Sequence, residues 1–353
     1  MLRKGIKTKF KQEKVPVVNL DFKIRSILTK CSFLILITVY FEIEKKFQNK
    51  INNEDPRVKN KHVDFNKLAI DKFTNETIQE NNSTKEIKAC VCVVAKKENL
   101  YAKEFVNHYI DLGYKHVYIY DNNDVNDEKF EDVLQREISL NYVTIINIRG
   151  EFKGMCPSFI DCYEKHGKEY DWLSFFDFDE LLDVKAKNIQ EFFSNPRYDK
   201  CVNIKFNFLF YSDNELLYYD NRTLQERFTT ALYKHPNNAY IKTTVRGGLP
   251  VNYWSVNCTP HTSKMNVTSC NSAGEKIPSG TGHTKVNFTY AALKHYYTKS
   301  TEEYLTKSNR GSVFYGKVNW DQKRKKMKFN YYFMYNKKTK EKVALLKKLF
   351  DMK

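Results

Sequence analysis

Short apolar runs alternate with segments of helical periodicity between residues 87 and 180. Four of these runs have the length and composition of buried strands: residues 87–95, 116–122, 142–148 and 172–180. The segments between them have apolar residues at helical spacing: residues 99–113, 127–138 and 158–170. This alternation predicts an α/β domain with a mainly parallel sheet flanked by helices.

Polar side chains stand where three of the predicted strands end. They are Lys97, Glu98 and Asn99 after the first strand, Asp121 and Asn122 after the second, and Asp177 and Asp179 after the fourth. Because the carboxyl ends of parallel strands meet at one edge of a sheet, and ligands bind there, we expect these groups to converge.

The segment DWLSFFDFDELLDV, residues 171–184, leads from an apolar strand directly into acidic residues. Burying a carboxylate is costly unless it is paired or binds a metal ion. Asp177 and Asp179 alternate along the chain, so both face one side and can offer oxygen ligands to Mg²⁺ or Mn²⁺ together with substrate phosphates. An isolated Asp-x-Asp is more often a solvated turn, but its place at the end of the fourth strand favours a metal–diphosphate site.

The N-terminal part of the chain has the pattern of a membrane-targeting segment. Residues 1–26 form a basic tail with eight Lys and Arg in the first 25 positions, and residues 27–43 are largely apolar. This predicts a signal-anchor helix with a cytoplasmic tail and a luminal catalytic domain, as in a single-pass type II Golgi protein. The open alternatives are a helix of a cytosolic protein and a cytosolic, membrane-associated enzyme. Residues 44–86 are polar and predict a flexible stem.

The rest of the chain divides into a predicted catalytic domain, residues 87–320, and a basic helical tail, residues 321–353. The tail is expected to close the domain through its apolar residues: Met327, Phe329, Phe333, Leu345, Leu346 and Phe350. A membrane-surface helix is the alternative.

Charge and cysteine content narrow the class of protein. The net charge of +17 comes mainly from lysines scattered among Asn and Tyr, which indicates a compositional bias and no nucleic-acid partner. The eight cysteines do not have the spacing of a metal cluster. Cys90 and Cys92 alternate on one face of a strand, and Cys258 with Cys270 is the best disulfide candidate in an oxidising compartment.

Four motifs in order resemble glycosyltransferase family 2-like and family 92 domains, over about residues 88 to 316. They are VCVVAKKENLYAKEFVNHYIDLGYKHVYIYDNND, the Asp-x-Asp segment, FLFYSDNELLYYDNRTLQERFT and LKHYYTKSTEEYLTKSNRG. The resemblance implies a GT-A fold and transfer of a sugar from a nucleotide-sugar donor to a glycan acceptor, usually with inversion and a divalent metal. It favours UDP-galactose, and hence a hexosyltransferase.

The resemblance also implies roles for individual residues. Asp177, Asp179 and His295 match the metal site. The groups expected to meet the nucleotide and its diphosphate are Lys97, Glu98, Asp121, Asn122, Asp177, Lys299, Ser300, Lys307 and Arg310. A neutral imidazole is a suitable third metal ligand, and Lys or Arg neutralises a leaving diphosphate.

Inverting transfer needs a base for the proton of the acceptor hydroxyl. The candidates are Asp213 and Glu215, in the segment expected to line the acceptor side, and Glu180. Three other functions remain open: an RNA- or lipid-binding protein, another metal-dependent nucleotide-phosphate enzyme, and an inactive glycosyltransferase-like binding protein.

Overall fold

The computed structural model describes residues 86–151, 154–250, 267–310 and 322–352, which belong to one compact unit. The predicted cytoplasmic tail, the signal anchor and all of the stem except Glu86 lie outside these residues. Among the described residues, no helix combines the length and the apolar character needed to cross a bilayer.

The strands follow the chain in this order: β1 (Ala89–Ala95), β2 (His116–Asp121), β3 (Val143–Asn147), β4 (Trp172–Phe175), β5 (Glu180–Val184), β6 (Asn203–Phe210), β7 (Ile241–Arg246), β8 (Ser269–Asn271), β9 (Lys276–Ile277) and β10 (Ala291–His295). The α-helices are α4 (Asn99–Asp111), α5 (Glu131–Ser139), α6 (Met155–His166), α7 (Ile189–Phe193), α8 (Leu224–Arg227), α9 (Thr301–Asn309), α10 (Gln322–Tyr335) and α11 (Lys340–Leu349). The single-turn 3₁₀ helices are η2 (Pro196–Tyr198) and η3 (Pro236–Ala239).

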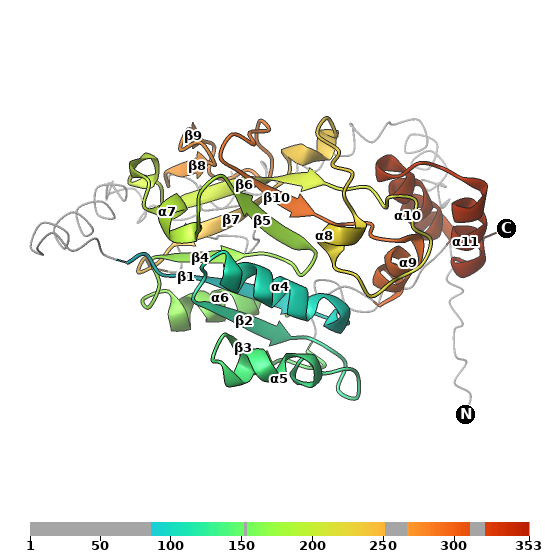
Figure 1. Cartoon of the computed structure of the whole chain (residues 1–353), viewed down its shortest axis with the longest axis horizontal. Coiled ribbons are helices and arrows are strands. Elements are labelled where there is room, and N and C mark those ends of the chain that lie inside the picture. The colour runs from blue at the N-terminus through green and yellow to red at the C-terminus, as the bar shows by residue number, and fades with distance from the viewer. Residues whose placement is uncertain (1–85, 152–153, 251–266, 311–321, 353) are drawn as a thin grey trace, which may run out of the picture. The chain divides into compact units, whose positions relative to one another are not determined.

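The strands form one sheet in the order β3-β2-β1-β4-β7-β6-β10-β5, with β8 beside β6 and β9 beside β8 (Figure 1). The four strands from β3 to β4 are parallel, as predicted. The other half is mixed, because β7 and β5 run antiparallel to their neighbours. The expectation of a mainly parallel sheet is therefore correct for half of the sheet only. Strand β5 begins only four residues after β4, too few for the crossover that joins parallel neighbours, and it pairs with β10 at the other end of the sheet.

Strand β1 is buried on both faces, which explains its uninterrupted apolar sequence. On one face Val91 and Val93 belong to the same core cluster as Phe105 of α4. On the other face Cys92 packs with Phe159 of α6. The sheet is thus covered by a helix on each side of β1, and the carboxyl end of the strand is held in a fixed place.

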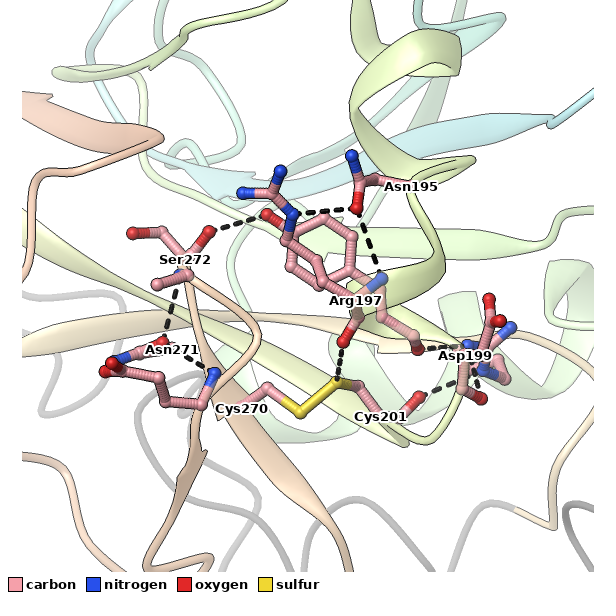
Figure 2. The surroundings of a disulfide bond; sticks show 11 residues. Asn195, Arg197, Asp199, Cys201, Cys270, Asn271 and Ser272 are labelled. Carbon is pink, nitrogen blue, oxygen red and sulfur yellow. Dashed lines mark hydrogen bonds between the residues drawn. A yellow bond between two sulfur atoms is a disulfide. The ribbon is translucent and has the colours of Figure 1, made fainter.

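Two disulfides join parts of the described chain that lie far apart in sequence. Cys92 of β1 bonds to Cys162 of α6, and Cys201 before β6 bonds to Cys270 of β8. Figure 2 shows the second bond beside the turn that carries Asn195 and Arg197. The predicted pairing of Cys258 with Cys270 is wrong, because Cys201 takes Cys270; Cys258 lies outside the described residues. The parallel pairing of β6 with β8 brings these cysteines together across 69 residues of sequence, and no local pattern reveals it.

The C-terminal helices pack onto α9. Phe329, Leu346 and Phe350 are buried in a cluster with Tyr304 of α9, and α11 contacts α9 directly (Figure 1). This agrees with the expected closing helix. Met327 is the exception, since more than half of its side chain is exposed.

Candidate active site

The acidic segment begins where β4 leaves the sheet. Phe176 and Phe178 are buried in the main core, so Asp177 and Asp179 alternate with them along the chain. The turn is closed by Glu180, whose Oε2 accepts a hydrogen bond from the backbone N–H of Asp177 at 2.9 Å. The alternation of phenylalanine with aspartate thus anchors the loop and fixes the two carboxylates at the end of β4.

Lysines compensate all three carboxylates. The ammonium groups of Lys299 (3.0 Å) and Lys307 contact Asp179 Oδ2. Lys242 of β7 reaches Asp177 Oδ2 at 2.9 Å and Glu180 Oε2 at 3.3 Å. Lys299 and Lys307 were expected here from the sequence, but Lys242 was not. In IKTTVR it looks like an ordinary solvent-facing strand residue, although its side chain is only 2% exposed. We call the three carboxylates and three lysines the acid–lysine cluster.

His295 completes one side of the cluster. The antiparallel register of β10 with β5 pairs His295 with Glu180. Its Nε2 lies 3.8 Å from Asp179 Oδ1 and 3.9 Å from Glu180 Oε1. The ring stacks on Phe210 at a centroid distance of 4.8 Å and also contacts Phe208, with centroids 4.4 Å apart. The structure therefore brings His295 next to Asp179, the residue with which the resemblance grouped it.

The protonation states follow from burial and from the lysines. Burial opposes ionisation of Asp179, but Lys299 and Lys307 outweigh it and hold the pKa of Asp179 well below its ordinary value. Burial raises the pKa of Glu180 well above its ordinary value. Burial lowers the pKa of His295 to about 3, so its imidazole is neutral at pH 7.

The donor chemistry of the cluster suits a divalent cation, although the present conformation does not assemble a coordination shell. Asp177 Oδ1, Glu180 Oε1 and His295 Nδ1 are buried and have no hydrogen-bond partner among the described residues. Buried polar atoms usually have a partner, such as another protein group, an ion or an ordered water. In the described part of the chain, however, no three His, Cys, Asp or Glu side chains are arranged as ligands of one metal.

A pocket of about 260 Å³ opens beside Lys299 and Lys307. Its polar and aromatic lining comes from distant parts of the chain: Lys97, Tyr101, Tyr219, Lys299, Glu302, Glu303, Thr306, Lys307 and Arg310. Arg310 donates to Glu98 Oε1 at 2.8 Å, which joins α9 to the start of α4. The predicted diphosphate-binding cations therefore line one pocket.

Ser300, which was predicted to meet the diphosphate, is buried at the start of α9. It is the N-cap of α9, and its hydroxyl accepts a hydrogen bond from the backbone N–H of Glu303. Lys299 immediately before it has φ of 52°, a left-handed conformation that is unfavourable for a lysine. The cap and the unusual backbone direct the Lys299 side chain toward Asp179.

Asp121 and Asn122 are already engaged within the protein. Asp121 is buried and accepts from Arg149 at 2.7 Å, and Asn122 donates to the carbonyl oxygens of Ile148 and Glu151. Arg149 also donates to three backbone carbonyls of the loop after β2, so it shapes this loop. Arg149 was not among the residues predicted from the sequence. Lys97 is tied to the same loop through Asp127 at 2.6 Å.

Asp213 belongs to a separate buried group, which we call the C-terminal latch. Its oxygens accept from Lys342 Nζ (2.7 and 2.9 Å), Tyr332 Oη (2.5 Å) and the backbone N–H of Glu215 (2.9 Å). The backbone N–H of Asp213 donates to Asn336 Oδ1 at 2.7 Å. Glu215 itself is largely exposed and pairs with Lys337 at the surface. Of the three predicted bases, Glu180 alone contacts Asp177 and its lysine partner.

Comparisons with known proteins give one family. The model of glycosyltransferase family 92 matches residues 85–343, almost the whole described region. No curated protein matches the chain. Among solved structures, similarity was found to the mannosyltransferase PcManGT from Pyrobaculum calidifontis in complex with GDP-Man and Mn²⁺, with a TM-score of 0.34, 10% identity and 69% of each chain covered. Residues 1–349 of S. aureus TarS with UDP-GlcNAc match with a TM-score of 0.34 and 10% identity, over 74% of this chain and 71% of that one. At these TM-scores the structural overlap supports no conclusion about this chain.

Proposed function

Because the chain belongs to glycosyltransferase family 92, and is thus a glycosyltransferase, we propose that it is a metal-dependent, inverting enzyme with a GT-A-type fold. It transfers a hexose, galactose from UDP-galactose, to a hydroxyl group of a glycan acceptor. The observation that carries this proposal is the acid–lysine cluster at the end of β4, which adjoins a pocket lined by cations.

The cations suit a nucleoside diphosphate. Lys299, Lys307 and Arg310 line one pocket with Lys97, and a leaving diphosphate carries the negative charge that such groups neutralise. In the free protein Lys299 and Lys307 are bound to Asp179. When the donor binds, we propose that their ammonium groups turn toward the phosphate oxygens and release Asp179 as a metal ligand.

Asp177, Asp179 and the neutral His295 are the residues that would hold a divalent cation. A bound Mn²⁺ or Mg²⁺ supplies charge neutralisation to the departing diphosphate. Burial opposes ionisation of Asp177, but Lys242 outweighs it and lowers the pKa of Asp177, so this carboxylate stays ionised and in place. Lys242 also holds Glu180 in position, although burial raises the pKa of Glu180.

The proton of the acceptor hydroxyl has to pass to a carboxylate. Both oxygens of Asp213 hold Lys342, so we propose a structural role for Asp213 and retain Glu180 and Glu215 as candidates for the base. Glu180 Oε1 lacks a partner among the described residues, and Glu215 is open to solvent. Replacing each by glutamine and following transfer at saturating donor would separate them, since loss of a general base costs about 10²- to 10⁴-fold in rate.

The test is donor binding and hydrolysis by the full-length chain across a panel of nucleotide sugars, with and without Mn²⁺. The variant is Asp179→Asn, and the control is Asp183→Asn, a largely exposed β5 carboxylate that pairs with Lys294. Metal-dependent binding of one donor, lost in Asp179→Asn and kept in the control, is the expected result. A folded wild-type protein that binds no donor would overturn the proposal and leave a binding protein on a glycosyltransferase scaffold.

For the cellular setting we propose a single-pass type II Golgi protein, with the helix over residues 27–43 in the membrane and the catalytic domain in the lumen. The two disulfides support an oxidising compartment, because disulfides persist there and are rare in the cytosol. Glycosidase sensitivity of the expressed chain, together with protease protection in sealed microsomes, tests this orientation.

A further inference from the structure

Arg227 of α8 is a buried arginine that contacts neither Asp179 nor any other member of the acid–lysine cluster in the described contacts. Its guanidinium makes a two-point ion pair with Glu303 of α9, at 2.6 and 3.0 Å, and both side chains are at most 3% exposed. Its Nε donates to the backbone carbonyl of Arg222 at 2.9 Å, so the guanidinium is fixed in orientation. A planar two-point contact of this kind defines distance and angle together.

Glu303 uses the same carboxylate to cap α9. Its Oε2 accepts from the backbone N–H of Ser300 at 3.1 Å, while the Ser300 hydroxyl accepts from the N–H of Glu303, which is a capping box. Tyr101 of α4 donates its hydroxyl to Glu303 Oε1 at 2.8 Å. One carboxylate therefore joins α4, α8 and the first turn of α9.

The cap sets the position of Lys299. Lys299 directly precedes Ser300, has left-handed backbone, and its ammonium group lies 4.5 Å from the centre of the Tyr101 ring while it contacts Asp179. A residue in an unfavourable backbone conformation keeps it only where its surroundings enforce it. Part of these surroundings is the capping box of Ser300 and Glu303, which directly follows Lys299.

The segment before α8 makes further bonds to the same helical turn. The backbone N–H groups of Thr301 and Glu302 donate to the carbonyl oxygens of Leu216 and Leu217, at 3.2 and 2.9 Å. The N–H of Tyr219 donates to Glu302 Oε2 at 2.9 Å. The first turn of α9 is thus satisfied by protein groups, so anion binding in the adjoining pocket falls to side chains, chiefly Lys299, Lys307 and Arg310.

We infer that Arg227 is a positioning residue: through Glu303 it holds the α9 cap in the geometry that aims Lys299 at the donor diphosphate. It connects the segment predicted to line the acceptor side with the diphosphate pocket. This inference rests on the proposed function, because it assumes that the pocket binds a nucleoside diphosphate.

The test is a double-mutant cycle between Arg227 and Lys299 on the full-length chain. UDP and GDP are titrated into the wild-type protein with Mn²⁺, and the tighter ligand is the probe. Arg227→Met is expected to weaken binding of that probe about tenfold, equivalent to about 1.4 kcal/mol. In a Lys299→Met background the same change should have almost no further effect, because residues that act through one another are not additive.

Arg222→Met is the matched control. Arg222 lies five residues earlier, is more than half exposed and pairs with the surface residue Asp220. The Arg222→Met variant should bind the probe with the same affinity as the wild type. If Arg227→Met fails to fold, Arg227→Lys keeps the charge but loses the two-point contact, and the same cycle applies to it.

The outcomes are distinct. An equal loss of affinity from the Arg227 change in both backgrounds would show a general structural role and overturn the inference, as would unchanged affinity in the wild-type background. If the wild type binds neither UDP nor GDP, the proposed function fails and the inference fails with it.

Discussion

Two groups of buried carboxylates compensated by lysine lie in this protein, and they differ in how completely their polar atoms are bonded. In the C-terminal latch, both oxygens of Asp213 accept hydrogen bonds, from Lys342, Tyr332 and a backbone N–H. In the acid–lysine cluster, Asp177 Oδ1, Glu180 Oε1 and His295 Nδ1 have no hydrogen-bond partner among the described residues. The carboxylate oxygens of the first group are fully hydrogen-bonded within the protein, whereas the second group has three buried polar atoms without a hydrogen-bond partner among the described residues.

Under the proposed function, this difference separates a structural group from a functional one. Leaving a buried polar atom unbonded costs about 1–3 kcal/mol, so a cluster with three such atoms is expensive to keep unless something else binds there. The adjoining pocket, lined by cations, points to what binds. In sequence the two groups look alike, since Asp177, Asp179 and Asp213 all follow apolar strands.

The largest expected effect comes from Asp179→Asn. The change removes the carboxylate shared by Lys299 and Lys307, and we expect donor turnover to fall by at least about 100-fold because charge stabilisation at the diphosphate is lost. Initial rates of donor hydrolysis, with circular dichroism to verify folding, measure this. Full activity in a folded variant would show that the acid–lysine cluster is not required for catalysis.

Asp213→Asn should act on stability instead. Lys342 would be left buried without its counter-charge, which typically costs about 3–5 kcal/mol in unfolding free energy. Urea unfolding measures the loss, and the folded fraction should keep its donor turnover. Glu215→Gln, an exposed neighbour, is the control and should change the unfolding free energy by less than about 1 kcal/mol. A rate loss of about 100-fold or more in folded Asp213→Asn would make Asp213 the base and break the comparison.

Lys242→Met should combine both effects, since Lys242 serves two carboxylates of the acid–lysine cluster from within the sheet. We expect a loss of stability of about 3 kcal/mol and weaker donor binding in the molecules that remain folded. Unfolding and donor titration on the same preparation measure the two effects. If stability falls but donor binding is unchanged, Lys242 has a structural role only.

The smallest expected effect is a change in how the free energy of unfolding depends on pH. Lys205 is buried and donates to the carbonyl oxygens of Pro278, Ser279 and Thr281, and burial lowers its pKa to about 8. Between pH 8 and the ordinary lysine pKa the unfolded chain binds more protons, so this group makes stability rise with pH in that window.

Lys205→Met should remove this contribution, whereas Lys276→Met, at an exposed position, should not. Unfolding free energies at pH 7.5 and 10 for each variant measure it. An unchanged pH slope in Lys205→Met would show that Lys205 is not the titrating group.

The sequence predicted most of the groups in the site because strand ends and motif order are local signals. Asp177, Asp179, His295, Lys299 and Lys307 do come together. It missed groups that act through long-range pairs: Lys242 lies more than 60 residues from Asp177, and Lys342 lies 129 residues from Asp213. Arg227 was part of a quoted motif, yet nothing local indicated its pairing with Glu303.

The same reason explains the errors in the fold. The parallel half of the sheet follows from strand–helix alternation, but the mixed half is set by contacts between β6, β7 and β10 that leave no periodic trace. The Cys201–Cys270 bond depends on the pairing of β6 with β8. Local periodicity therefore predicts the helices and strands, whereas the pairing of strands and of cysteines depends on tertiary contacts.

The most direct measurement is a crystal structure of the full-length chain grown with Mn²⁺ and UDP, with manganese located by its anomalous scattering. We predict a manganese peak coordinated by Asp177, Asp179 and His295, with Lys299 and Lys307 turned from Asp179 to the diphosphate. Manganese and UDP bound elsewhere, with both lysines still on Asp179, would contradict the account.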